Sequence, residues 1–304
     1  MYTDDGDDSG DLFKKDFKYY KRKAVRPDLS NVIDFERPDE FPVKVHARLQ
    51  TTPDCSEVGL VDEGELRCYS VPANRGLLVI PNPFTPRGQR QWVSRTLRSY
   101  PQPPNCTNLK ALKPPDVFPA SPQRDDFYKN LRWVTLGLHH DWDSKVYDLE
   151  NATAFPSCLS ALAKKLATLL GHTGFEPEAA IVNYYAMNST LSGHVDRSEF
   201  DLSSPLFSVS FGQTAVFLIG GATKDVKPTA MFLKSGDVVV MTGESRLAYH
   251  AVPLVLPRED GGMPWNYAAE MRGGDDADGD WGAEAEYLAN HRINLNVRQV
   301  FEKS

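Results

Sequence analysis

Two histidines, one aspartate and two arginines, far apart in the chain, are side chains whose types could do chemistry together. His194 and Asp196 form a His-x-Asp pair, and His250 follows later in the stretch ESRLAYHAV. Two imidazoles and one carboxylate are the ligand set that holds non-haem Fe(II) on one triangular face and leaves other positions open. Arg292 and Arg298 carry permanently charged planar forks that suit a dicarboxylate. Together these residues predict a metal centre with a carboxylate co-substrate beside it.

The His-x-Asp pair is weak by itself, because aspartate is common and such neighbours arise by chance. Its position strengthens it, since the pair follows a strand-like stretch and the small residues STLSG, as a site at a barrel mouth requires. Alternation in an extended segment points both side chains the same way. His250 alone could be a satisfied core histidine, and the order of the motifs favours a third ligand. The histidines interpreted as structural or exposed are His139, His140, His172 and His291.

Alternation also marks the run RINLNVR near the end of the chain. One face of this predicted strand is polar and the other is apolar. The polar residues are Arg292, Asn294, Asn296 and Arg298, and the apolar ones are Ile293, Leu295 and Val297. A half-exposed surface strand would show the same pattern. The fixed charges at both ends favour capture of an anion inside a barrel, because a guanidinium can clamp a carboxylate with two hydrogen bonds.

Composition bounds the class of protein. With 304 residues, 41% of them hydrophobic, the chain can bury a large core. The longest apolar runs, AVFLIGG and DVVVM, fall well short of the roughly 20 residues of a membrane helix. The acidic start MYTDDGDDSGD does not resemble a signal peptide. Scattered cysteines predict four free thiols in a reducing compartment: Cys55, Cys68, Cys106 and Cys158. We expect a monomer in the nucleus and cytoplasm, with the mitochondrion as an alternative.

The net charge of −7 argues against a nucleic-acid partner until its distribution is considered. Residues 1–11 carry five acids, and residues 259–286 carry nine acids against one arginine. The remaining body is therefore basic and could contact phosphates, although the acidic stretches could equally be ordinary solvated faces. Arg95 and Arg98 are the residues whose reversal to glutamate we expect to weaken such binding.

Periodicity predicts a helical N-terminal half and a β-rich C-terminal half. Residues 13, 17 and 20 are aromatic at helical spacing opposite lysines, so this helix could touch phosphates or dock on the core. Further predicted elements are a strand at 77–80, a helix capped by Thr85, a leucine-lined helix ending at Gly171, and a short helix near 286–290. Short β runs from residue 179 onward predict a jelly roll. The predicted parts are a disordered acidic tail (1–10), a helix and extended arm (11–75), a helical part with a nucleotide-recognition lid (76–178), and the core (179–304) with an acidic insertion (258–286).

Motifs along the whole chain carry a resemblance to a known family. In order they are IPNPF, LRWVT, DWDSK, NYY, HVDRSE, SFGQ, PTAMF, SGDVV, SRL, HAVP and VRQV, between about residues 11 and 301. The chain resembles the AlkB family of Fe(II)- and 2-oxoglutarate-dependent dioxygenases, and most of all its homologue-one branch. The resemblance implies an α+β fold, with a double-stranded β-helix (jelly-roll) core, helices packed on one side and an N-terminal recognition extension. It implies Fe(II), 2-oxoglutarate and O2 as cofactor and co-substrates.

The resemblance also assigns roles to residues. Iron would be bound by His194, Asp196 and His250. Contacts with 2-oxoglutarate would come from Asn183, Tyr185, Arg292, Asn294 and Arg298, with Arg292 on the far carboxylate and Arg298 near the ketoacid end. Substrate contacts would come from Trp133, Tyr147, Ser198 and Glu199. Trp133 would stack on a base, although it and Tyr147 could instead be core aromatics. Bacterial-type members have an acid where Ser198 stands, which leaves substrate choice open.

The implied reaction removes a methyl group from a base nitrogen by oxidation and releases formaldehyde. A base inside a duplex cannot reach such a pocket, so it must be flipped or presented by a loop, which favours folded RNA. We expect tRNA carrying 1-methyladenine as the substrate, with DNA N6-methyladenine and RNA cytosine modifications as further candidates. Two alternatives stay open: the same oxygenase chemistry on a protein such as a histone, and a non-catalytic binding scaffold.

Overall fold

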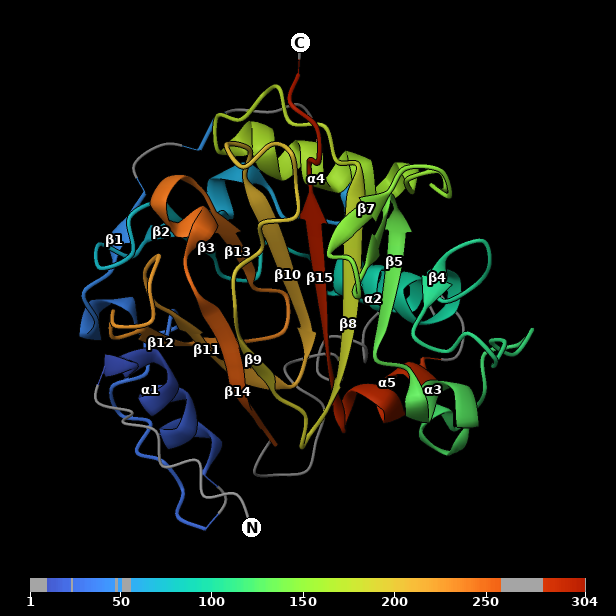
Figure 1. Ribbon diagram of the computed structural model, residues 1–304, viewed down its shortest axis with the longest axis horizontal. Helices are drawn as coiled ribbons and strands as arrows, with labels where there is room; N and C mark the ends of the chain where they lie inside the picture. Colours follow the sequence, from blue (N-terminus) through green and yellow to red (C-terminus); the bar gives the residue numbers. More distant parts are fainter. Residues whose placement is uncertain (1–9, 23, 47–48, 51–55, 258–280, 304) are drawn as a thin grey trace.

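Two β-sheets face one another and hold the site between them (Figure 1). The computed structural model describes residues 10–22, 24–46, 49–50, 56–257 and 281–303. Within these residues the major sheet has nine strands, the minor sheet has four, and a separate hairpin has two. The predicted acidic tail, apart from Gly10, and residues 258–280 of the predicted insertion lie outside the described residues.

All pairings between neighbouring strands of these sheets are antiparallel. The major sheet runs in the order β1 (Lys44–Val45), β2 (Tyr69–Ser70), β3 (Leu77–Ile80), β13 (Val238–Met241), β10 (Leu206–Gly212), β15 (His291–Arg298), β8 (Ala179–Ala186), β5 (Trp133–Gly137) and β4 (Cys106–Thr107). The minor sheet runs in the order β12 (Thr229–Leu233), β11 (Thr214–Ile219), β14 (His250–Leu256) and β9 (Leu191–His194). The hairpin pairs β6 (His139–Asp141) with β7 (Val146–Asp148).

Strand β15 lies at the middle of the major sheet, between β10 and β8. Its apolar residues Ile293, Leu295 and Val297 belong to the core on the helix side of the sheet. Its alternate residues line a cavity between the two sheets, among them Arg292 and Arg298. The polar face predicted from alternation is therefore inside the barrel and not on the molecular surface.

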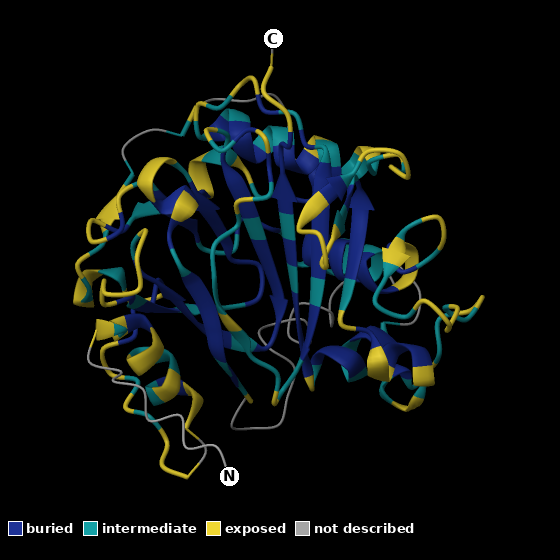
Figure 2. Ribbon diagram, in the orientation of Figure 1, coloured by how far each residue is buried: buried dark blue, intermediate teal, exposed yellow. Residues whose placement is uncertain are grey.

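Helices cover the outer faces of both sheets (Figures 1 and 2). Helix α2 (Pro86–Ser94), its continuation η5 (Arg95–Ser99) and α4 (Ser157–Leu169) contribute to the main core with the major sheet. The cap predicted at Thr85 is confirmed, because its hydroxyl accepts a hydrogen bond from Gly88 N at 3.0 Å. Leucines of α4 are almost fully buried, each stabilising the fold by about 1.5–3 kcal/mol. The α+β jelly-roll prediction is confirmed.

Helix α1 (Leu12–Lys21) packs on the outer face of the minor sheet. Phe13 and Tyr20 are buried there, while the lysines of the helix are exposed. Of the two open readings for this helix, docking on the core is therefore the one that the structure shows. Two further short helices are α3 (Asp126–Asn130) and α5 (Gly282–Leu288). Helix α5 begins earlier than the helix predicted near residues 286–290.

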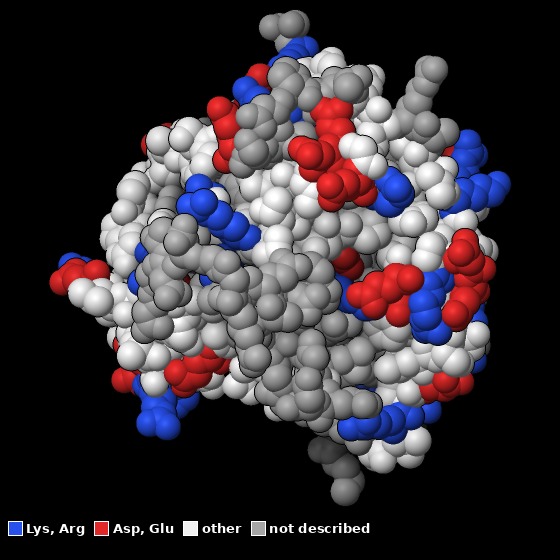
Figure 3. Space-filling view, turned by 180° about the vertical axis from the view of Figure 1, so that it is seen from behind, with Lys and Arg blue, Asp and Glu red and all other residues white. Residues whose placement is uncertain are grey.

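Arg95 and Arg98 of the α2 region have partners within the fold, and their contact with phosphates stays a prediction. The Arg95 guanidinium lies 4.7 Å from the centre of the Trp92 ring, and Arg98 Nη2 donates to Glu284 Oε2 at 2.9 Å. Both side chains are thus engaged within the fold, on the helix side of the major sheet. On the face seen in Figure 3, described Lys and Arg side chains lie interspersed with Asp and Glu, so the charge there is mixed.

Two sequence expectations concern membranes and thiols. No helix in the described part of the chain is both long and apolar enough to cross a membrane. Cys68, Cys106 and Cys158 are free thiols, and Cys55 lies outside the described residues.

Candidate metal and co-substrate site

Pairing between the minor-sheet strands β9 and β14 brings the two predicted histidine ligands together. His194 ends β9, His250 begins β14, and the two residues are paired across the strands. Their ring centres lie 4.3 Å apart. Asp196 follows β9 by two residues, with Oδ1 3.8 Å from His194 Nε2 and Oδ2 3.7 Å from His250 Nε2. All three ligand atoms lie within 4.8 Å of one another, so the set could hold one metal ion.

Backbone carbonyls orient both imidazoles. His194 Nδ1 lies 2.9 Å from Ser192 O, and His250 Nδ1 lies 3.1 Å from Ala248 O. A carbonyl oxygen can only accept, so Nδ1 carries the proton in each ring and Nε2 keeps a free lone pair. Burial lowers the pKa of His250 to about 4, which keeps this imidazole neutral near pH 7. Both rings are therefore prepared to bind a metal through Nε2.

Arg298 and Arg246 hold the aspartate from two sides. Arg298 Nη2 donates to Asp196 Oδ2 at 2.9 Å, and Arg246 Nη1 donates to the main-chain oxygen of Asp196 at 2.7 Å. Burial by itself would raise the pKa of Asp196, but the charge of Arg298 holds it well below its usual value. The ligand is therefore a carboxylate, with Oδ1 nearest His194 Nε2 and Oδ2 nearest His250 Nε2. The resemblance places Arg298 near the ketoacid end of 2-oxoglutarate, and the structure adds its hydrogen bond to Asp196.

A cavity of about 930 Å³ opens at this triad and extends between the sheets. The predicted co-substrate residues line it, because β8 and β15 pair with Tyr185 opposite Arg292 and Asn183 opposite Asn294. Asn294 Nδ2 donates to Ser208 Oγ at 2.8 Å, and Asn294 Oδ1 accepts from Asn296 Nδ2 at 2.8 Å. The structure thus gathers all five residues on one wall, and their contacts with 2-oxoglutarate stay predictions.

Arg292 lies in this wall as a buried cation. Its side chain is about 1% exposed, and it donates to Ser210 Oγ at 2.7 Å, Leu233 O at 3.1 Å and Gln213 O at 3.3 Å. Its Nε has no hydrogen-bond partner in the described part of the chain. Burial lowers its pKa to about 10, which still leaves it charged near neutral pH. A buried guanidinium with neutral partners and a vacant donor fits the far carboxylate of a ketoacid.

Two of the residues predicted to contact substrate are enclosed in the fold. Tyr147 donates to Glu199 Oε1 at 2.7 Å, and Glu199 Oε2 accepts from Arg246 Nη2 at 2.9 Å. Burial would raise the pKa of Glu199, but Arg298 and Arg246 bring it below its ordinary value, so Glu199 is ionised. Both residues are about 5% exposed, and Glu199 can be buried as an anion because Arg246 and Arg298 neutralise it. They act within the wall of the site, and a direct contact with a base does not follow from their positions.

The other two lie nearer the cavity mouth. Ser198 Oγ is 3.1 Å from His140 Nε2, and both residues line the cavity. Trp133 does not line it directly but contacts Trp142, with ring centres 5.6 Å apart. Trp142 lines the cavity and is 46% exposed. The structure therefore places the Trp142 ring at the cavity, and the stacking of Trp133 on a base stays a prediction.

Three residues of the site were missed. His140 was interpreted as structural or exposed, Trp142 was not singled out, and Arg246 was quoted only inside a motif. The polar turn at 141–145 implies an exposed hairpin tip. It could have suggested a role for His140 in β6 and for Trp142 just after it. No local signal marks Arg246, because its partners come from two other segments.

The chemistry of the donor set fits Fe(II), and the vacant donor of Arg292 fits 2-oxoglutarate. A double-stranded β-helix with two histidines and one carboxylate at its mouth, and in its wall a buried arginine whose hydrogen-bond partners among the described residues are neutral, defines a class. That class is the non-haem iron oxygenases that use a 2-oxo acid.

Comparison with known proteins agrees with this class. Residues 76–298 match the model of the 2OG-Fe(II) oxygenase superfamily. The chain is 40% identical to "Nucleic acid dioxygenase ALKBH1" of Mus musculus, over 95% of this chain and 84% of that protein. It is 33% identical to "tRNA demethylase abh1" of Schizosaccharomyces pombe, over 96% of this chain and 97% of that protein. It is 34% identical to "DNA N(6)-methyladenine demethylase ALKBH1A" of Arabidopsis thaliana, over 95% and 92%.

A solved structure, "The structure of OsALKBH1", matches with a TM-score of 0.52 and 20% identity, over 74% of this chain and 96% of that chain. At this identity it supports the fold alone. The chain belongs to the 2OG-Fe(II) oxygenase superfamily and, within it, to the homologue-one branch of the AlkB family. It is a 2-oxoglutarate-dependent dioxygenase, with Fe(II) as its metal and 2-oxoglutarate and O2 as co-substrates.

Proposed function

We propose that the chain is an oxidative demethylase of N-methylated bases in nucleic acid, with tRNA carrying 1-methyladenine as its substrate. DNA N6-methyladenine and RNA cytosine modifications are further candidate substrates. The observation that carries the proposal is one continuous cavity, which joins the metal triad to an aromatic and basic mouth. The names of the fission yeast and mouse relatives, a tRNA demethylase and a nucleic acid dioxygenase, support it.

The mouth has the two kinds of side chain that a flipped nucleotide needs. Trp142 and His140 lie in edge-to-face contact, with ring centres 4.7 Å apart, and offer a surface for a base. Three exposed cations line the same cavity: Lys145, Arg197 and Lys224. Cations around an aromatic surface would bind the phosphates on either side of the target base.

The residues of the chain would divide the work of the reaction. His194, Asp196 and His250 would hold the iron on one face, and Arg292 would fix the far carboxylate of 2-oxoglutarate. With 2-oxoglutarate and O2, bound Fe(II) supplies the oxidation that turns the N-methyl group into N-hydroxymethyl and yields succinate and CO2. The C–N bond of the hydroxymethyl product then breaks, its electron pair stays on the base nitrogen, and formaldehyde and the hydroxyl proton leave. Arg298 would hold Asp196 Oδ2 and so fix the orientation of the carboxylate beside the two histidines.

The test is a nucleoside assay by mass spectrometry. Wild type, Asp196→Asn and the control Asp39→Asn, an exposed carboxylate outside the cavity, are each incubated with Fe(II), 2-oxoglutarate and methylated tRNA, DNA or RNA. We expect loss of 1-methyladenine from tRNA, with matching succinate and formaldehyde, in wild type and control only. Equal demethylation by Asp196→Asn, or turnover restricted to a methylated lysine peptide, would contradict the proposal. We also propose that the chain acts as a monomer, which light scattering during the same preparation tests.

A further inference from the structure

A buried group of charges lies behind the metal-binding carboxylate. Arg298 and Arg246 hold Asp196 by its side chain and its main chain, and the same two guanidinium groups converge on Glu199. Arg246 Nη2 lies 2.9 Å from Glu199 Oε2, and Arg298 Nη1 lies 3.4 Å from Glu199 Oε1. The side chain of Glu199 is fully enclosed and that of Arg246 is about 1% exposed. Glu199 is therefore the shared counter-ion of the two arginines that place Asp196.

The same group of charges reaches the hairpin formed by β6 and β7. The Tyr147 hydroxyl on β7 donates to Glu199 Oε1 at 2.7 Å and accepts from Arg298 Nη1 at 3.2 Å. A second link joins His140 on β6 to Ser198, which stands between Asp196 and Glu199 in sequence. The hairpin that presents Trp142 at the cavity mouth is thus bonded at two points to the segment that supplies a metal ligand.

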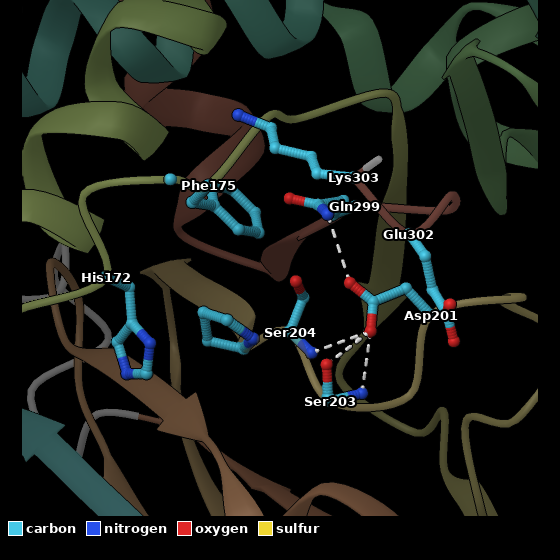
Figure 4. Close-up of a pocket in the computed structure, with 10 residues that line it drawn as sticks. His172, Phe175, Asp201, Ser203, Ser204, Gln299, Glu302 and Lys303 are labelled. Carbon is cyan, nitrogen blue, oxygen red and sulfur yellow. Dashed lines mark hydrogen bonds between the residues drawn. The ribbon is translucent and has the colours of Figure 1, made fainter.

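The far end of this segment is fixed as well. Asp201 Oδ1 accepts from Ser203 Oγ at 2.6 Å, and Asp201 Oδ2 accepts from Gln299 Nε2 at 3.0 Å (Figure 4). The amide nitrogens of Phe200 and Asp201 both donate to Val300 O at 2.9 Å. Glu199 consequently stands between two anchored positions, and it cannot turn into the cavity without breaking several buried hydrogen bonds.

We propose that Glu199 and Tyr147 are positioning residues that couple the base-recognition hairpin to the metal-binding Asp196. This role rests on the proposed function, since it assumes that a base meets the hairpin. If Glu199 loses its charge, Asp196 remains the carboxylate that Arg298 contacts, at 2.9 Å. Arg298 then competes more strongly with the metal for Asp196, and metal binding weakens. A base resting on the hairpin acts through Tyr147 on Arg298, and so on Asp196.

The first experiment needs no nucleic acid. We measure the affinity for Mn(II) of wild type, Glu199→Gln and Glu284→Gln, where Glu284 is the control because it is a buried carboxylate that pairs with Arg98 outside the cavity. Loss of a group that orients a metal ligand typically weakens metal binding by about 10- to 100-fold. We expect this loss for Glu199→Gln alone. Equal Mn(II) affinity in all three proteins would overturn the positioning of Asp196 by Glu199.

The second experiment removes one hydroxyl from the hairpin. Tyr147→Phe is compared with Tyr128→Phe, which removes an equally buried hydroxyl that donates to Leu97 O at 2.8 Å on the helix side. The readout is the anaerobic charge-transfer absorption of the Fe(II)–2-oxoglutarate complex before and after methylated tRNA is added. We expect the band in all three proteins, a substrate-induced shift in wild type and Tyr128→Phe, and no shift in Tyr147→Phe. Tyr147→Phe should also consume 2-oxoglutarate in excess of demethylated base.

The outcomes separate the two proposals. A shift that persists unchanged in Tyr147→Phe would overturn the coupling while leaving the demethylase proposal intact. If no methylated nucleic acid changes the wild-type band or is demethylated, the proposed function and the coupling to a base both fail. The Mn(II) measurement then decides by itself whether Glu199 positions Asp196.

Discussion

Replacement of Arg292 is the sharpest test of the co-substrate site. The guanidinium is buried, its three hydrogen-bond acceptors in the described structure are neutral, and its Nε is unpaired. An anion that binds here gains a permanent counter-charge in a dry environment. Arg292→Lys keeps a charge and loses the planar fork, while Arg292→Met removes the charge but keeps much of the volume.

The magnitudes follow from the contacts that are lost. One charge-assisted hydrogen bond contributes about 1.5–3 kcal/mol. Its loss in Arg292→Lys should weaken 2-oxoglutarate binding about 10- to 100-fold, since about 1.4 kcal/mol corresponds to a factor of ten. Removal of one partner of a buried charge pair costs about 2–5 kcal/mol. Arg292→Met should therefore weaken binding by at least about 30-fold, and the far carboxylate accounts for this loss.

The assay is calorimetric titration of the Mn(II)-loaded proteins with 2-oxoglutarate and, separately, with pyruvate. Pyruvate has the ketoacid group and lacks the far carboxylate, so both Arg292 variants should bind it like wild type. Arg67→Lys is the control, because Arg67 is exposed and donates only to the main-chain oxygens of Gly64 and Leu66. Unchanged 2-oxoglutarate affinity in Arg292→Met, or an equal loss for pyruvate, would refute the assignment of Arg292 to the far carboxylate.

Three further predictions concern stability and binding. Burial raises the pKa of Asp237 to about 7, so the folded state holds this proton more tightly than the unfolded chain. The unfolding free energy of the metal-free protein should then fall by up to about 4 kcal/mol as pH rises from about 4 to 7, and Asp237→Asn should flatten that slope in denaturant titrations. A Cβ at Gly193 would lie 2.7 Å from Phe13 Cε1, so Gly193→Ala should lower the free energy of unfolding by about 1–3 kcal/mol. An unchanged melting temperature would contradict this close packing. Charge reversal at Arg197 and Lys224 should weaken tRNA binding and lower its dependence on salt concentration in a filter-binding assay. Lys44→Glu is the control, because Lys44 is exposed and lies outside the cavity. Salt slopes equal to that of wild type would exclude Arg197 and Lys224 from the phosphate contacts.

Much of the site could be predicted because its motifs are local or periodic. His-x-Asp places two ligands two residues apart at the end of β9, and the alternation of β15 separates a polar wall from an apolar core. The cap at Thr85 and the leucines of α4 also depend on short spacings, so the structure agrees with them. Patterns of this kind need no knowledge of which distant segments meet.

The rest depends on contacts between segments that no spacing reveals. Arg246 contacts Asp196, Glu199 and Ser204 across a sheet, so its role emerges only once those residues are placed. In the sequence, Arg95 and Arg98 look like phosphate ligands. A helix face rich in arginine shows the same pattern whether its arginines contact phosphates or other parts of the protein. Arg95 contacts Trp92 and Arg98 pairs with Glu284, which the helix pattern alone does not reveal, and their binding of phosphates stays a prediction.

The two arginines of β15 show how charge balance separates a ligand site from a structural one. Arg292 and Arg298 occupy the same face of β15 and are similarly buried. The alternating sequence pattern alone does not distinguish them. Arg298 meets Asp196 at 2.9 Å and Glu199 at 3.4 Å, so carboxylates of the chain neutralise it. Arg292 meets a hydroxyl and two carbonyl oxygens, which solvate its charge and do not neutralise it. Burying a cation without a counter-ion costs free energy, and a bound anion would offset that cost. This supports the assignment of Arg292, rather than Arg298, to the far carboxylate of 2-oxoglutarate.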